Sequence, residues 1–192
     1  MNLPNQLTVS RILMTFLLMA LLFVPGGAAK GMALLLFLLC CLTDYLDGRI
    51  ARARGLVTDF GKIMDPLADK VLVVGVFLAF VELQLVASWM VALIVAREFL
   101  ITGVRLFAIR RGQVLAAETA GKHKTFSQMT TILLILLFLF LRAVSQELTF
   151  WGPERELLFK QTITVCMVVT VLLTLASGFL YLWKNRGLIR SL

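Results

Sequence analysis

Four aspartates stand in two pairs in the first half of the chain. Asp44 and Asp47 are three residues apart, and Asp65 and Asp69 are four residues apart. Residues at these spacings share one face of a helix, so each pair presents two carboxylates in the same direction. Carboxylate oxygens are hard ligands that select Mg²⁺, Mn²⁺ or Ca²⁺. If the two pairs meet, they can hold two divalent ions, and two such ions can bridge and neutralise a diphosphate.

Small residues and one arginine lie between the two pairs. Gly48 and Ala51 leave the helix surface bare, and Arg52 follows Gly48 by one turn, within reach of a phosphate oxygen. Gly61 precedes Asp65 by one turn, where a side chain would crowd the site. The alternative is that the aspartates are interfacial charges paired with the cations Arg49, Arg54 and Lys62. The two helical pairs and the interleaved small residues favour the ligand site.

A second group of charges follows in the other half of the chain. Arg97 and Glu98 lie near the middle of an apolar run, where a charge is costly and usually faces a cavity or a partner. Arg105 lies seven residues after Glu98 on the same helix face, so an ion pair between these two is an open alternative. Lys122 and Lys124 each read alone as ordinary loop charges. Together the four cations predict a pocket for an anionic acceptor, most simply one with a phosphate.

The segments that must position these charges are strongly apolar. The chain has 192 residues, of which 60% are hydrophobic and 16% charged, whereas a soluble domain is about half apolar and about a quarter charged. Runs near the roughly 20 residues of a membrane-spanning helix fall at 9–25, 31–54, 63–84, 88–109, 126–146 and 161–183. Open strands cannot satisfy their backbone in lipid. We therefore predict an all-α polytopic membrane protein with six transmembrane helices, preceded by a short N-terminal interfacial helix.

The distribution of basic residues predicts the orientation in the membrane. Six spans place both termini on one side, and all but four of the 19 Lys and Arg residues belong to that side. The exceptions are Lys30, Arg142, Arg155 and Lys160. The positive-inside rule therefore puts both termini and the aspartates in the cytoplasm. Anionic lipids and a phosphorylated substrate account for the net charge of +8, so no nucleic-acid partner is predicted.

The stretch from Asp44 to Asp69 resembles the signature of the CDP-alcohol phosphotransferase family, D-x2-D-G-x2-A-R-x8-G-x3-D-x3-D. The matching positions are Asp44, Asp47, Gly48, Ala51, Arg52, Gly61, Asp65 and Asp69. The six-helix layout also agrees with that family, so the resemblance covers nearly the whole chain as one membrane domain, residues 1–192. Members transfer a phosphatidyl or similar group from a CDP-linked donor to an alcohol and release CMP. The resemblance implies an enzyme of the bacterial inner membrane and a homodimer.

The resemblance also implies roles for individual residues. Asp44, Asp47, Asp65 and Asp69 would hold two Mg²⁺ or Mn²⁺ ions on the diphosphate of the donor, and Asp69 would also be the base for the attacking hydroxyl. The donor, CDP-diacylglycerol, would contact Asn5, Thr8, Gly48, Ala51, Arg52, Thr58 and Gly61.

The choice of acceptor depends on the second group of charges. The segments NLPNQLT, DPLADK, AREFLITGVR and GKHKT resemble family members whose acceptor is sn-glycerol 3-phosphate. Its phosphate would lie among Arg97, Arg105, Lys122 and Lys124. Serine or phosphatidylglycerol would not require so many cations, whereas inositol phosphate would and is the nearest alternative. A cation transporter is the alternative outside the family, but transporter carboxylates tend to lie near the bilayer midplane.

Overall fold

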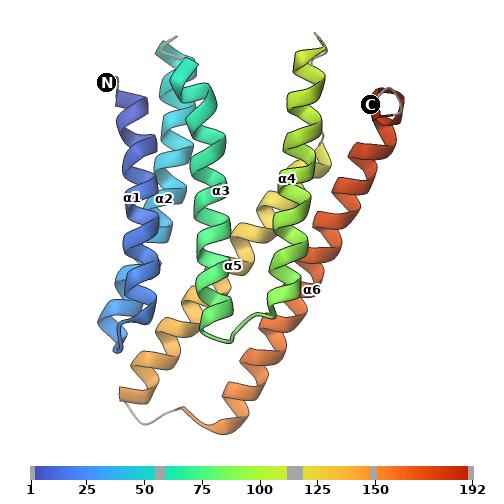
Figure 1. The fold of residues 1–192 in the computed structure, drawn as a ribbon. Helices are drawn as coiled ribbons and strands as arrows, with labels where there is room; N and C mark the ends of the chain where they lie inside the picture. The colour runs from blue at the N-terminus through green and yellow to red at the C-terminus, as the bar shows by residue number, and fades with distance from the viewer. Residues whose placement is uncertain (1–2, 55–58, 112–118, 148–150, 190–192) are drawn as a thin grey trace.

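The structure, a computed structural model, describes residues 3–54, 59–111, 119–147 and 151–189. Side chains outside the described part are those at 3–5, 7, 45–54, 59–63, 65, 110, 119–120, 122, 147 and 188–189. Within the described ranges the helices are α1 (Leu3–Phe23), α2 (Gly27–Arg54), α3 (Asp59–Glu82), α4 (Ser88–Arg110), α5 (Thr119–Glu147), α6 (Pro153–Lys184) and α7 (Arg186–Ile189) (Figure 1). The predicted all-α class is confirmed.

The lengths of α1 to α6, 21 to 32 residues, match the thickness of a bilayer. Among the described residues, α2, α5 and α6 are long and apolar enough to cross a membrane, and Thr8–Phe23 of α1 is a shorter apolar helix. Helices α3 and α4 carry Asp69, Lys70, Arg97, Glu98 and Arg105, and these charges lower the hydropathy of both helices. The chain is thus a helical membrane protein, and the count of six spans stays a prediction.

The N-terminal segment does not form a helix of its own. Helix α1 runs without a break from Leu3 to Phe23. Pro4 lies in its first turn, where a proline is tolerated because the missing N–H would lack a partner anyway. Thr8, Arg11 and Thr15 are buried on one face of α1, which fixes the segment against the bundle. The predicted short interfacial helix is therefore wrong.

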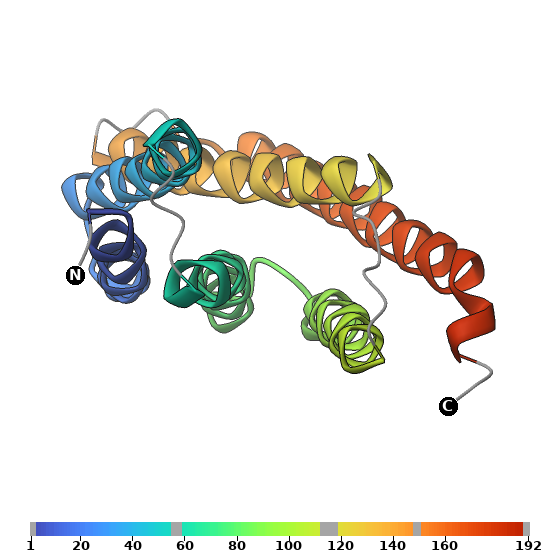
Figure 2. The ribbon, with the colours of Figure 1, turned by 90° about the horizontal axis from the view of Figure 1, so that it is seen from above.

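The helices form a bundle with both ends of the chain at the same end (Figure 1). Helix α1 packs against α2 and α3, α5 packs against α2 and α6, and α4 packs against α6 and α3. Seen from above, α5 and α6 lie on one side of α3 and α4 (Figure 2). Helices α3 and α4 thus face α5 and α6 across the bundle (Figure 2).

Apolar and polar side chains occupy different halves of the bundle interior. The apolar core includes Leu18 and Leu22 near the end of α1 and Phe77 and Phe80 near the end of α3, both at the end opposite the termini. The buried polar side chains include Thr8 and Arg11 of α1, Lys124 and Gln128 of α5, and Thr174 and Ser177 of α6. These lie toward the termini. The apolar half thus fixes the helices, and the other half is left for polar chemistry.

Large apolar side chains cover the outside of the bundle. Leu13, Phe99, Phe126 and Phe179 are each more than 60% exposed. Soluble monomers rarely expose so large an apolar surface to water. In a membrane the same surface is not unfavourable, because lipid tails are as apolar as leucine. The exterior is that of a protein embedded in a membrane.

A polar and aromatic cluster joins α5 and α6 at the end away from the termini. The indole of Trp151 donates to Glu156 Oε2 at 2.9 Å, and Arg142 forms an ion pair with the same oxygen at 3.2 Å. The Trp151 ring also stacks on Phe159, with ring centres 5.3 Å apart. This cluster holds the end of α5 against the start of α6. The opposite ends of these two helices line a cavity.

Candidate active site

One arginine joins one aspartate of each pair. Arg11 Nη1 of α1 lies 2.9 Å from Asp44 Oδ1 of α2 and 3.0 Å from Asp69 Oδ1 of α3. The Arg11 side chain is 1% exposed, whereas those of Asp44 and Asp69 are 51% and 45% exposed. The two carboxylates therefore contact the same buried cation, and each remains about half exposed. One aspartate of each predicted pair therefore contacts the same arginine, and the convergence of the two complete pairs stays a prediction.

The sequence interpretation missed Arg11. It is a single charge at the start of an apolar run, and a charge in such a place is a functional candidate by default. Thr15 Oγ1 donates to the Arg11 carbonyl at 2.8 Å. Thr8, a predicted donor contact, is 1% exposed one turn before Arg11. This face of α1 thus forms the floor of the aspartate site.

The other predicted donor and metal residues lie beyond the described side chains. Asp47, Gly48, Ala51 and Arg52 belong to α2, Gly61 and Asp65 to α3, and Asn5 to α1, but only their helical backbone is described. Thr58 lies outside the described residues altogether. Among the side chains that are described, no group of three or more metal-ligating residues is present.

The residues that are described fit a divalent cation. Two carboxylate oxygens lie within 3.0 Å of one cationic nitrogen, so their arrangement already selects positive charge. Both carboxylates are about half exposed, which leaves room for an ion that keeps part of its water shell. Such hard oxygen donors suit Mg²⁺ and Mn²⁺.

A cavity of about 550 Å³ lies between α3, α4, α5 and α6. Its volume is in the range of small-molecule sites. Among the residues that the structure describes, four cations line it: Lys70, Arg97, Arg105 and Lys124. Three of the four predicted acceptor residues, Arg97, Arg105 and Lys124, therefore share one cavity. Lys122 belongs to α5, but its side chain lies outside the described residues.

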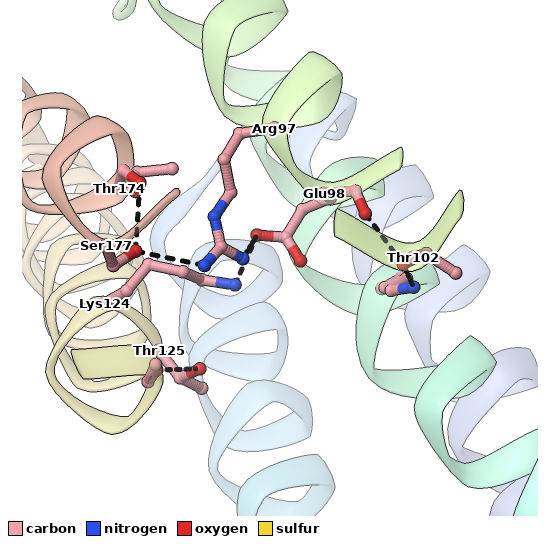
Figure 3. Close-up of polar contacts among 9 residues, drawn as sticks. Arg97, Glu98, Thr102, Lys124, Thr125, Thr174 and Ser177 are labelled. Carbon is pink, nitrogen blue, oxygen red and sulfur yellow. Dashed lines mark hydrogen bonds and ion pairs between the residues drawn. The ribbon is translucent and has the colours of Figure 1, made fainter. Parts of the chain in front are cut away.

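A small polar network holds two of these cations in place (Figure 3). Arg97 donates from Nη2 to Ser177 Oγ at 3.1 Å and from Nη1 to Glu98 Oε1 at 3.3 Å. Lys124 donates to the same Glu98 oxygen. Ser177 in turn donates to the Thr174 carbonyl at 2.9 Å. One carboxylate thus faces two cations, and the network keeps a positive charge.

The remaining cations of the cavity are held differently. Arg105 does not pair with Glu98, the alternative that the sequence left open, but lies over the Tyr181 ring with its guanidinium carbon 6.0 Å from the ring centre. Lys70 donates to Thr102 Oγ1. The sequence interpretation did not name Lys70, although it directly follows the last aspartate of the signature. Both cations remain able to face an anion.

A second, smaller cavity of about 180 Å³ adjoins the first. Asp69 lines this second cavity, and Arg97 and Arg105 line the larger one. The residues that line both are Pro66, Lys70, Glu98, Lys124 and Thr125. The basic cavity therefore borders the space in front of Asp69.

These features define a class of protein: a helical membrane protein in which two half-exposed carboxylates on a buried arginine lie beside a basic cavity. Residues 1–183 match the model of the CDP-alcohol phosphatidyltransferase family. A CDP-diacylglycerol–glycerol-3-phosphate 3-phosphatidyltransferase of Bacillus subtilis is 36% identical, over 96% of this chain and 95% of the relative.

Relatives from other bacteria carry the same name. The protein of Rickettsia typhi is 39% identical over 71% of this chain and 76% of its own length. That of Treponema pallidum is 36% identical over 82% of this chain and 71% of its own length. The chain belongs to the CDP-alcohol phosphatidyltransferase family, and the resemblance inferred from the aspartate signature is confirmed.

Proposed function

We propose that this enzyme transfers the phosphatidyl group from CDP-diacylglycerol to sn-glycerol 3-phosphate, giving phosphatidylglycerophosphate and CMP. The observation that carries this proposal is the basic cavity beside the smaller cavity that Asp69 lines. An acceptor without a phosphate would not require four cations in one cavity. The names of the relatives agree with this choice of substrates.

The donor binds where α1, α2 and α3 meet. Asp44, Asp47, Asp65 and Asp69 would hold two Mg²⁺ or Mn²⁺ ions, which would neutralise the diphosphate charge. The contacts to the CDP part and its phosphates come from Asn5, Thr8, Gly48, Ala51, Arg52, Thr58 and Gly61. The convergence of Asp44 and Asp69 on one cation supports this assignment.

The acceptor binds with its phosphate in the larger cavity. Arg97, Arg105, Lys122 and Lys124 contact the phosphate, and Lys70 adds a fifth positive charge. A hydroxyl of the acceptor then reaches the smaller cavity, where Asp69 accepts its proton. The hydroxyl oxygen bonds to the phosphorus that carries the diacylglycerol, the bond to the bridging oxygen breaks, and CMP leaves with that oxygen. Such a transfer depends mainly on in-line positioning and on charge stabilisation.

An acceptor panel tests the proposal directly. Purified protein is supplied with CDP-diacylglycerol, Mg²⁺ or Mn²⁺, and one acceptor at a time, and CMP release is measured. We expect turnover with sn-glycerol 3-phosphate and little with serine or phosphatidylglycerol. Preferential turnover of inositol phosphate would contradict the assigned acceptor, and no CMP release with any alcohol would contradict the reaction.

We further propose that all six long helices span the bacterial inner membrane, with both termini and the active site on the cytoplasmic side. The position of the two chain ends at one end of the bundle (Figure 1) supports an even number of spans. The basic residues favour the cytoplasmic side for that end. Family resemblance alone suggests a homodimer, which cross-linking in native membranes would test.

A further inference from the structure

Glu98 is the single carboxylate among the described residues that line the larger cavity. A fixed negative charge beside a phosphate site repels the phosphate and weakens its binding. We therefore expect Glu98 to have a function that the neighbouring cations cannot supply. Its contacts to Arg97 and Lys124 give it a structural role (Figure 3). Both cations contact the same oxygen, Oε1, so the carboxylate has a second oxygen with which it can bind something else.

The position of Glu98 between the two cavities supplies one. It lines the larger cavity with Arg105 and the smaller cavity with Asp69. An acceptor whose phosphate lies near Arg105 and whose reacting hydroxyl lies near Asp69 passes the residues that line both cavities, and Glu98 is the carboxylate among them. The middle carbon of a phosphorylated vicinal diol carries a second hydroxyl, which takes no part in the reaction.

The geometry points to Glu98 as the residue that selects this second hydroxyl, by accepting its hydrogen bond. This inference rests on the proposed function. Arg97 and Lys124 both contact Oε1, and a carboxylate has about four acceptor positions over its two oxygens, so it can bind a further donor. The Glu98 side chain is 13% exposed, so a hydroxyl bound here would be largely shielded from water. Cations alone would bind any phosphorylated alcohol; Glu98 adds a requirement for the diol.

The test compares two acceptors that differ in the middle hydroxyl alone: sn-glycerol 3-phosphate and 3-hydroxypropyl phosphate. The measured quantity is the ratio of their kcat/KM values with CDP-diacylglycerol. A hydrogen bond to a charged group would give the unsubstituted enzyme a preference of about 10- to 100-fold for the diol. In Glu98→Ala the ratio should fall close to one, and in Glu98→Gln, which keeps one acceptor oxygen, it should be intermediate.

The ratio separates selection from a general loss of phosphate binding. Loss of the contacts to Arg97 and Lys124 weakens both acceptors and cancels in the ratio. Arg105→Ala is the matched control, since it should lower kcat/KM for both acceptors and leave their ratio unchanged. The inference is overturned if the ratio is the same in Glu98→Gln as in the unsubstituted enzyme, or if that enzyme does not distinguish the two acceptors. If the unsubstituted enzyme releases CMP with neither acceptor, the proposed function fails as well.

Discussion

Single charged residues control each part of the site, and each has a counter-charge that spacing in the sequence does not reveal. Arg11 lies between Asp44 and Asp69, and Glu98 lies between Arg97 and Lys124. In both clusters the central charge is opposite to those around it. Each cluster is therefore held together without a bound substrate. A ligand with the same charge as one member of the cluster can take the place of that member: a cation in the aspartate cluster, and an anion in the Glu98 cluster.

At this scale Asp69 gives a direct prediction. Asp69→Asn removes the proton acceptor but keeps the size of the side chain, so kcat should fall by at least about 100-fold, within the range of general base catalysis. Radiolabelled CDP-diacylglycerol with glycerol 3-phosphate measures the CMP released. The matched control is Asp44→Asn, which should lower Mn²⁺ affinity and be partly rescued by excess metal. Full turnover by Asp69→Asn would show that another group is the base.

Helices α1, α2 and α3 are joined by Arg11, so its loss should affect the packing of whole elements. Arg11→Gln leaves the Asp44 and Asp69 carboxylates close together without their shared cation. We expect a lower Tm without metal, by about 2–4 °C for each kcal/mol lost. Added Mn²⁺ should raise Tm more in the variant than in the unsubstituted protein, because the ion replaces the missing charge.

Arg142→Gln is the control for this experiment. Arg142 pairs with Glu156 at the far end of α5, away from the aspartates. Its loss should shift Tm equally with and without Mn²⁺. If Arg11→Gln behaves in the same way as Arg142→Gln, Arg11 does not substitute for metal charge.

The contact between α4 and α6 depends on a glycine. A Cβ added at Gly178 would lie 3.0 Å from Arg97 Cγ and 3.4 Å from Arg97 Nε. Arg97 therefore packs against α6 at Gly178, where no side chain is in the way. From there it donates a hydrogen bond to the Ser177 hydroxyl. The position of this cation in the cavity is fixed by a helix that is far from it in sequence.

Gly178→Ala should displace Arg97 and raise the KM for glycerol 3-phosphate by about tenfold, as expected for the loss of one charged hydrogen bond. The KM for CDP-diacylglycerol should change little, since the donor binds elsewhere. Gly103→Ala on α4 is the matched control, because a Cβ there meets nothing within 4 Å. Equal changes for both substrates in Gly178→Ala would indicate general misfolding.

Over the whole molecule, the sequence predicted the helices better than their contacts. Apolar runs identified all six long helices, but α5 begins at Thr119 and α6 at Pro153, before the predicted 126 and 161. Hydropathy detects the apolar part of a helix. In α5 and α6 the helical backbone begins several residues before that part. The prediction of a separate N-terminal helix is wrong for a related reason. The polar residues at the start of the chain continue the helix α1 and do not mark a change of element.

The site was predictable where its residues lie close in sequence. The two helical aspartate pairs and the short connection between them indicated that Asp44 and Asp69 could meet. Nothing in that spacing indicated Arg11, which contacts both from α1. Glu98 was compared with Arg105 on its own helix, whereas its partner Lys124 lies 26 residues away on α5. Local spacing reports one helix face at a time. Contacts between faces depend on packing, which the sequence pattern alone does not determine.

Orientation in the membrane is the remaining property of the whole molecule, and labelling can test it. Single cysteines are placed at Glu154, in the first turn of α6, and at Lys184, its last residue, after the three native cysteines are replaced by alanine. Both positions are exposed. The side rich in Lys and Arg stays in the cytoplasm. In intact cells a membrane-impermeant maleimide should therefore label Glu154→Cys, and Lys184→Cys only after the membrane is opened. Labelling of both from outside would show that α6 does not span the bilayer, and the reverse pattern would place the site on the outer face.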